Sequence, residues 1–159
     1  MRPPPTSTRH AFTLVEILIV VVILGILAAI VVPRFAGASE QARVTAFGTS
    51  LMTYADAAEY YSAREGRYPA DSSSGVVPSG MELYIEEDEW TGGTPLGGVW
   101  DTEYNDSGVS AAVGVHFMGG DNPGDAVMAL VDDAFDDGDL STGLFQKLAG
   151  DRYYYILAP

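Results

Sequence analysis

Cysteine is absent from the chain, and basic residues are scarce. The lack of cysteine excludes disulfide bonds and cysteine-rich zinc sites. Lysine and arginine together number 8 against 22 aspartates and glutamates, so the formal net charge is −14. Because nucleic-acid phosphates require a basic surface, this balance argues against nucleic-acid binding. We expect instead a soluble exterior face whose like charges repel one another.

Histidine is nearly as scarce, which limits the catalytic chemistry available. The two histidines are His10, before a long apolar run, and His116, within a strand-like stretch, where we expect a structural or surface role. No Ser–His–Asp, Cys–His or metal–carboxylate arrangement can be argued from the residue pattern. The glycine-rich stretch 91–98 lacks the lysine of a phosphate-binding loop. We therefore expect a protein that is not an enzyme.

Long apolar runs, in contrast, are not lacking: residues 11–33 form one that holds a single carboxylate, Glu16. A helix over residues 12–32 would span about 31 Å, the thickness of the hydrocarbon core of a bilayer. The acid costs about 2.5–3.5 kcal/mol near the helix centre, whereas each aliphatic residue favours insertion by roughly 0.3–0.6 kcal/mol. We therefore predict a membrane-spanning helix, in which a retained charge usually has a function.

Positive charge precedes the apolar run. Arg2 and Arg9 lie before it, and Arg34 is the only charge close to its other end. The positive-inside rule then keeps the N-terminus in the cytoplasm and sends the rest of the chain outward. At 159 residues, the chain can hold one modest domain besides the membrane segment.

The start of the run carries a specific motif. Six residues from Ala11 read Ala-Phe-Thr-Leu-Val-Glu, which resembles the processing site of type IV prepilins and type II secretion pseudopilins. The resemblance implies that a membrane peptidase cuts between Ala11 and Phe12 and that the new amine of Phe12 is N-methylated. Glu16, Gly25 and Pro33 then stand at the fifth, fourteenth and twenty-second mature positions, as in the family. The family usually has glycine where this chain has Ala11.

The residue spacing and the family resemblance each suggest a role for Phe12 and Glu16. Phe12 and Glu16 lie four apart on one helical face, so the new ammonium could pair with the carboxylate within one chain. The resemblance implies a further pairing, between Glu16 of an incoming subunit and Phe12 of an assembled one, which would set the subunit register. Gly25 and Pro33 are weak points of a helix, and the resemblance implies that this stretch unwinds on assembly.

The resemblance implies a structural subunit of a pilus-like filament in the bacterial inner membrane, single-pass, with a cytoplasmic N-terminus and a periplasmic head. Implied partners are the chain itself, other pilin-like subunits, the prepilin peptidase and methyltransferase, the assembly platform and membrane lipid. The missing cysteine, the Gly-Arg-Tyr-Pro of residues 66–69 and an acidic C-terminal loop favour a type II secretion pseudopilin. A pilin of a type IV pilus, or a membrane-anchored binding domain that never polymerises, stays an alternative.

Helical periodicity resumes after the run and ends at Gly66, with Pro69 beyond it. Its apolar stripe is formed by Val44, Phe47, Leu51, Tyr54, Ala55, Ala58 and Tyr61. A helix this long cannot be buried by one small domain, so its first half needs lipid or other subunits. We predict a cleaved leader over 1–11, a transmembrane and assembly helix over 12–33, its amphipathic continuation over 34–66, and a globular head over 67–159.

The head is predicted to be α+β, with the long helix packed on a small antiparallel sheet, as in pilins. Alternation and β-branched or aromatic content predict three strands, over 99–104, 109–118 and 153–158. A short amphipathic helix is expected over 126–134. The three tyrosines that begin the last strand are expected to face core and solvent alternately, and the acidic residues 86–89 are expected to form a solvated turn.

Acidic residues also gather around Gly138. Calcium prefers such oxygen ligands, although the spacing does not match an EF-hand. Major pseudopilins use calcium to order their C-terminal loop, so the resemblance makes this cluster a candidate calcium site. We favour the other interpretation, an acidic helix end and turn that holds no ion and partly repels itself. The candidate ligands are Asp133, Asp136, Asp137 and Asp139.

Overall fold

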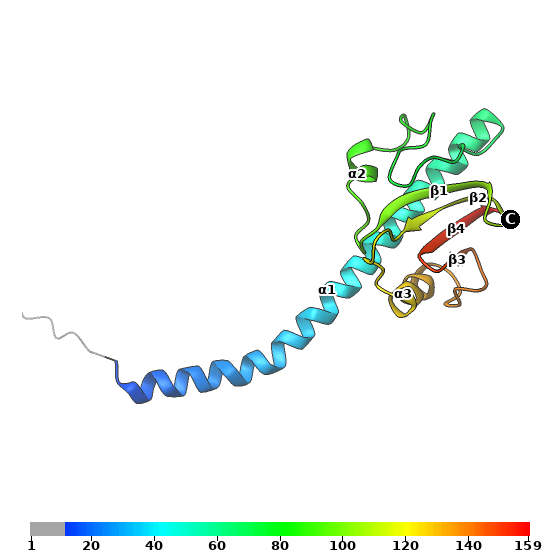
Figure 1. Cartoon of the computed structure of the whole chain (residues 1–159). Helices are drawn as coiled ribbons and strands as arrows, with labels where there is room; N and C mark the ends of the chain where they lie inside the picture. The colour runs from blue at the N-terminus through cyan, green and yellow to red at the C-terminus, as the bar shows by residue number, and fades with distance from the viewer. Residues whose placement is uncertain (1–11) are drawn as a thin grey trace, which may run out of the picture. The chain divides into compact units, whose positions relative to one another are not determined.

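A computed structural model describes residues 12–159, and within α1 it gives only the helical backbone for residues 32–36. The expected leader, residues 1–11, lies outside the described residues. The chain divides into two compact units, one up to Glu40 and one from Gln41 to Pro159. Figure 1 shows the elements, whose bounds are α1 Leu14–Glu65, α2 Glu87–Thr91, β1 Val99–Asp106, β2 Val109–His116, α3 Asp125–Phe135, β3 Phe145–Ala149 and β4 Arg152–Ala158.

The N-terminal unit is the first part of α1. The segment Leu14–Val31 is long and apolar enough to cross a membrane, and none of it is buried. Leucine, isoleucine and valine cover it on all sides, so it presents no single apolar face to a core. This helix agrees with the expected membrane-spanning segment in its type and position.

The C-terminal unit begins with the amphipathic part of α1. The predicted stripe is confirmed: all seven of its residues, from Val44 to Tyr61, are buried. The helix ends at Glu65 because Gly66 takes a positive φ of 73°, which closes the last turn through a 2.8 Å hydrogen bond from its N–H to the carbonyl of Ser62. In this unit, α1 lies along one face of the sheet (Figure 1).

The sheet has four antiparallel strands in the order β1-β2-β4-β3. Three of them match the predicted strands, with β2 ending at His116 and β4 beginning at Arg152. The edge strand β3 was not predicted. Its outer N–H groups are already occupied, since Phe145 donates to the Asp136 carboxylate and Lys147 donates to the carbonyl of Leu140 at 2.9 Å.

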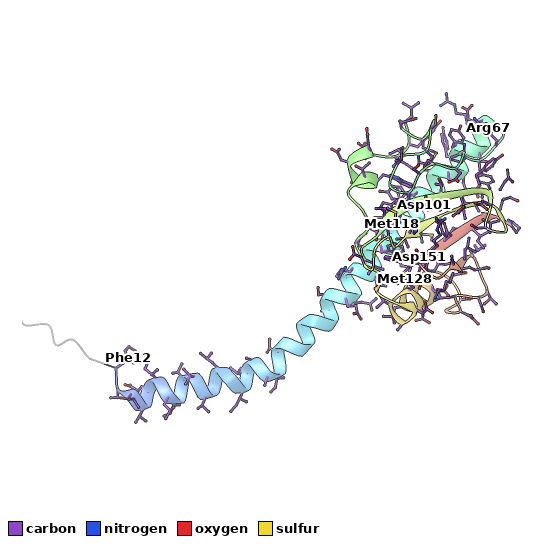
Figure 2. The ribbon with its side chains drawn as sticks, in the orientation of Figure 1. Phe12, Arg67, Asp101, Met118, Met128 and Asp151 are labelled. Atoms are coloured by element: carbon purple, nitrogen blue, oxygen red, sulfur yellow. The ribbon has the colours of Figure 1, made fainter. Side chains whose placement is uncertain are left out.

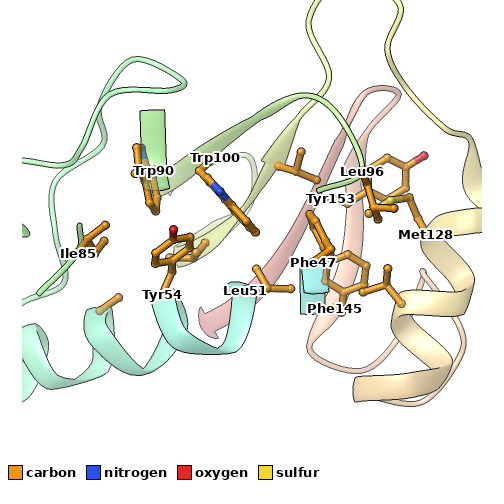
Figure 3. Close-up of a cluster of buried hydrophobic side chains, with 14 of the residues drawn as sticks. Phe47, Leu51, Tyr54, Ile85, Trp90, Leu96, Trp100, Met128, Phe145 and Tyr153 are labelled. Carbon is orange, nitrogen blue, oxygen red and sulfur yellow. The ribbon is translucent and has the colours of Figure 1, made fainter. Parts of the chain in front are cut away.

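Aromatic side chains join α1 to the sheet (Figure 3). Phe47 stacks on Trp100 with ring centroids 5.2 Å apart, and it meets Phe145 edge-on at 6.4 Å. Tyr54 meets Trp90 at 5.0 Å and Trp100 at 4.9 Å, both edge-on. Each such pair contributes about 0.5–1.5 kcal/mol beyond the burial of its area. The head therefore has one aromatic core, which joins the amphipathic part of α1 to the sheet.

Two expectations for the head are wrong in detail. The acidic residues 86–89 lead into the short helix α2, not a plain turn, because Trp90 is buried in the core while the acids stay exposed at the helix start. Tyr154 does not face solvent but is fully buried on the sheet face away from α1. Gly114 makes room for it: a Cβ there would lie 2.6 Å from the Tyr154 Cα.

Candidate assembly and ion-binding sites

The carboxylate of Glu16 is held by the start of its own helix. Its Oε2 accepts a hydrogen bond from the Thr13 N–H at 2.9 Å and another from the Thr13 hydroxyl at 3.0 Å. The Thr13 Oγ1 accepts in return from the Glu16 N–H at 3.2 Å. This reciprocal arrangement is a capping box, and it places a negative charge at the positive end of the helix dipole. Thr13 thereby lowers the cost of keeping an acid next to an apolar helix.

The other residues of the N-terminal motif fall as follows. Ala11 lies outside the described residues, so the structure does not describe the expected cleavage site in full. Phe12 is 81% exposed, immediately before the capping box. Gly25 has open space where a Cβ would point, and α1 runs without a break through Pro33. Unwinding at Gly25 and Pro33 stays a prediction about the assembled state.

A second candidate site lies where α3 ends. Among the described residues, Asp132, Asp136 and Asp137 each offer a carboxylate oxygen within 4.8 Å of the others. Asp136 and Asp137 were expected there. Asp133 and Asp139 are not part of this group, and Asp132, which sequence reasoning did not choose, completes it. The signal was present: Asp132 follows the buried Met128 by four residues, on the same helical face.

Asp132 is the unusual member of this acidic site. It is fully buried, and neither of its oxygens accepts a hydrogen bond from the described residues. Burial raises the pKa of its carboxyl, and the charges of Asp136 and Asp137 raise it further. Protonation, or a cation beside the carboxylate, would stabilise an acid in this position.

Its two partners are tied to the chain that follows. The Asp136 Oδ2 accepts from the N–H groups of Leu144 and Phe145, the latter at 2.8 Å. The Asp137 carboxylate accepts from the Asp139 N–H at 2.9 Å and from the Thr142 hydroxyl at 2.8 Å. Three carboxylates this close fit a calcium ion, which takes oxygen ligands at about 2.3–2.6 Å. The donor set and the orphaned Asp132 therefore suit a hard divalent cation.

An exposed apolar helix with a capped acid at its start, followed by an α+β head, is consistent with a pilin-like fold. Residues 6–32 match the family described as the prokaryotic N-terminal methylation motif. The model covers the N-terminal motif alone, and the relatives below are similar to the chain over about half of its length or less.

The curated relatives share one name, type II secretion system core protein G. The protein of Pseudomonas aeruginosa is 46% identical over 79 residues, which cover 50% of this chain and 51% of the relative. That of Escherichia coli K12 is 31% identical over 81 residues, covering 51% and 52%. That of Klebsiella pneumoniae is 39% identical over 61 residues, covering 38% and 44%. The chain thus spans about half the length of the curated relatives it matches. No solved structure matches it.

Proposed function

We propose that the chain is a structural subunit of a pilus-like filament, a pseudopilin of a type II secretion system. The observation that carries this proposal is the helix Leu14–Val31, whose side chains are all exposed. Each aliphatic side chain gains about 1.5–3 kcal/mol when it leaves water, so this surface requires a cover. Lipid covers it before assembly, and other subunits cover it afterwards. The methylation motif and the core protein G relatives support this assignment.

The processing step follows from the N-terminal residues. In the proposal, prepilin peptidase cuts between Ala11 and Phe12, and the new amine of Phe12 is methylated. The ammonium then lies beside Glu16, whose carboxylate is held by Thr13. An incoming subunit offers its own Glu16 to this amine, so assembly exchanges a contact within one chain for one between chains. The protein is a substrate in this scheme and performs no catalysis.

The cellular setting follows from the same scheme. We place the helix in the bacterial inner membrane, with the N-terminus in the cytoplasm and the head in the periplasm. The partners are copies of this chain, other pilin-like subunits, the processing enzyme and the inner-membrane assembly platform. Basic residues number only 8 in the whole chain, which supports protein and lipid partners over nucleic acid.

We further propose that Asp132, Asp136 and Asp137 hold a calcium ion. The ion supplies positive charge to the buried Asp132 and leaves the hydrogen bonds of Asp136 to the start of β3 in place. Binding would therefore order the segment between α3 and β3. Asp133 and Asp139 lie next to this site in sequence and add negative charge that attracts the cation.

Substitution of Glu16 in its native host tests the filament proposal. The Glu16→Ala variant should be processed and inserted, yet fail to form filaments. Glu40→Ala is the matched control, since Glu40 is also an exposed acid of α1, and it should assemble normally. Filament yield after shearing and the mass of the N-terminal peptide are the measurements. Filaments from Glu16→Ala at the wild-type yield, or a chain that retains residues 1–11, would contradict the proposal.

A further inference from the structure

A small cavity lies between α1 and the sheet, beneath the loop that follows α1. Its volume is about 10 Å³, which is room for one water molecule. Figure 2 labels Arg67 in this loop, and the next two residues, Tyr68 and Pro69, line the cavity. The space exists because three lining residues have short side chains, namely Ala58 of α1 and Ala111 and Ala112 of β2.

The hydroxyl of Thr102 lies on the side of β1 that faces this cavity. Thr102 lines the cavity and comes two residues after Trp100, which stacks on Phe47 of α1. Side chains two apart on a strand point the same way, so Thr102 points toward α1. It is only 4% exposed, and its Oγ1 has no hydrogen-bond partner among the described residues. Because a buried hydroxyl without a partner is unfavourable, this side chain requires a polar partner in the cavity.

Strand β4 is irregular at the same place. Ala111 and Ala112 of β2 pair with Ala158 and Ile156 of β4, so Leu157 has no partner on β2. A bulge of this kind leaves its extra residue unpaired and disrupts the ladder locally. Leu157 also lines the cavity, so the bulge brings main-chain polar groups to its wall.

Two oxygen atoms at the cavity can accept a further hydrogen bond. The Tyr68 hydroxyl oxygen is 2.9 Å from the Glu59 Oε1 and 3.4 Å from the Leu157 carbonyl oxygen. Its single proton goes to the nearer and charged acceptor, Glu59, which leaves the Tyr68 oxygen with lone pairs. The Leu157 carbonyl has no good donor in Tyr68, because 3.4 Å is long for a hydroxyl. Thr102 can supply the proton that this arrangement of acceptors lacks.

We propose that the cavity is a binding site for one internal water molecule. The Thr102 hydroxyl donates to the water, and the water donates its two protons to the Leu157 carbonyl and to the Tyr68 oxygen. Three hydrogen bonds are the usual number for a buried water. The water thereby ties the loop after α1 to β1 and to the bulge of β4. Tyr68 and Pro69 of the Gly-Arg-Tyr-Pro sequence cover this site, which belongs to the head and does not depend on filament assembly.

A crystal structure of the full chain, grown from detergent at a resolution that shows ordered water, tests the site directly. The expected result is density for one water within hydrogen-bond distance of the Thr102 Oγ1 and the Leu157 carbonyl oxygen. Thr102→Ser keeps the hydroxyl and should keep this water. A wild-type structure without that density, or with the Thr102 hydroxyl bonded to a protein group, would overturn the proposal.

Thr102→Val tests the site in solution by urea unfolding of the full chain, because valine matches threonine in size but lacks the hydroxyl. Loss of the hydrogen bond to the water should lower the ratio of folded to unfolded chain by about threefold to tenfold. The matched control is Thr53→Val, at an exposed threonine of α1 whose hydroxyl donates to the Thr49 carbonyl at 2.9 Å. This control should change the ratio by less than about twofold.

A Thr102 hydroxyl without any partner predicts the opposite sign, since its removal would stabilise the head. A ratio that rises in Thr102→Val, or that stays within the range of the control, therefore contradicts the water site. The wild-type crystal structure needs no variant, so the test survives a variant that fails to fold.

Discussion

The close approach of β2 and β4 at Gly114 predicts a severe effect of a single methyl group. Gly114 pairs with Tyr154. A Cβ on Gly114 would lie 2.1 Å from the Tyr153 carbonyl oxygen and 2.6 Å from the Tyr154 Cα. Both are backbone atoms, so no side-chain rotation relieves the overlap. In Gly114→Ala the strands must separate locally by about 1.3 Å, the difference between 2.1 Å and an ordinary contact of 3.4 Å.

The cost can be worked from this displacement. Two ladder hydrogen bonds would be lost at about 1 kcal/mol each. Overpacking around the buried Tyr154 adds about 1–3 kcal/mol. Replacing a strand glycine by alanine recovers only about 0.5–1 kcal/mol of backbone entropy. We expect Gly114→Ala to lower the free energy of unfolding by about 2–4 kcal/mol, a large share of the about 5–15 kcal/mol of an ordinary domain.

The assay is urea unfolding of the full chain in detergent, followed by the fluorescence of the buried Trp90 and Trp100. Gly150→Ala is the matched control, because Gly150 lies in the β3–β4 turn with open space where its Cβ would be. This control should change stability by less than about 1 kcal/mol. If Gly114→Ala had the same urea midpoint as Gly150→Ala, the close strand contact at Gly114 would not exist in solution.

Three further predictions concern titration, the ion and the helix start. Burial raises the folded-state pKa of Glu103 and of Asp132 above the unfolded values of 4.5 and 3.8. In calcium-free buffer, the free energy of unfolding should therefore fall as the pH rises above these unfolded values. If the free energy of unfolding did not fall, the burial of the two acids would be contradicted. Millimolar calcium should raise the Tm of wild type and of Asp133→Asn but not of Asp132→Asn. Thr13→Val should destabilise the start of α1 by about 1 kcal/mol, seen as faster amide exchange at Glu16; Thr45→Val should not.

Local periodicity was sufficient to predict α3 and the amphipathic part of α1, because each buries one regular face. The apolar run predicted the first part of α1, and alternation with β-branched or aromatic residues predicted three strands. The edge strand β3 was missed because its sequence, Phe-Gln-Lys-Leu-Ala, has only one fully buried side chain. Its place is set by distant groups, among them the carboxylate of Asp136. Asp101 likewise looks like a solvent-facing residue of an alternating strand. Its burial depends on Ser74 and Tyr154, which are 27 and 53 residues away in sequence.

The candidate sites also divide into residues that local sequence indicates and residues that it does not. The N-terminal motif predicts Glu16 as a site residue, and Thr13 could have been found with it, since Thr-Leu-Val-Glu is a capping-box pattern. Asp132 could have been separated from Asp133 by its helical distance from the buried Met128. Nothing in local sequence indicates that Asp132 lacks a hydrogen-bond partner, because that depends on how the chain after α3 folds back.

In the proposed filament, the occupied outer edge of β3 bears on how subunits pack at high density. Exposed edge strands recruit one another into cross-β aggregates, and crowding accelerates this. Here a carboxylate and a loop carbonyl take the N–H groups that a neighbouring strand would need. Heads brought side by side in a polymer would thus have little to gain from β-pairing at this edge. If the proposed filament is held through its helices, it can come apart into intact subunits and be rebuilt.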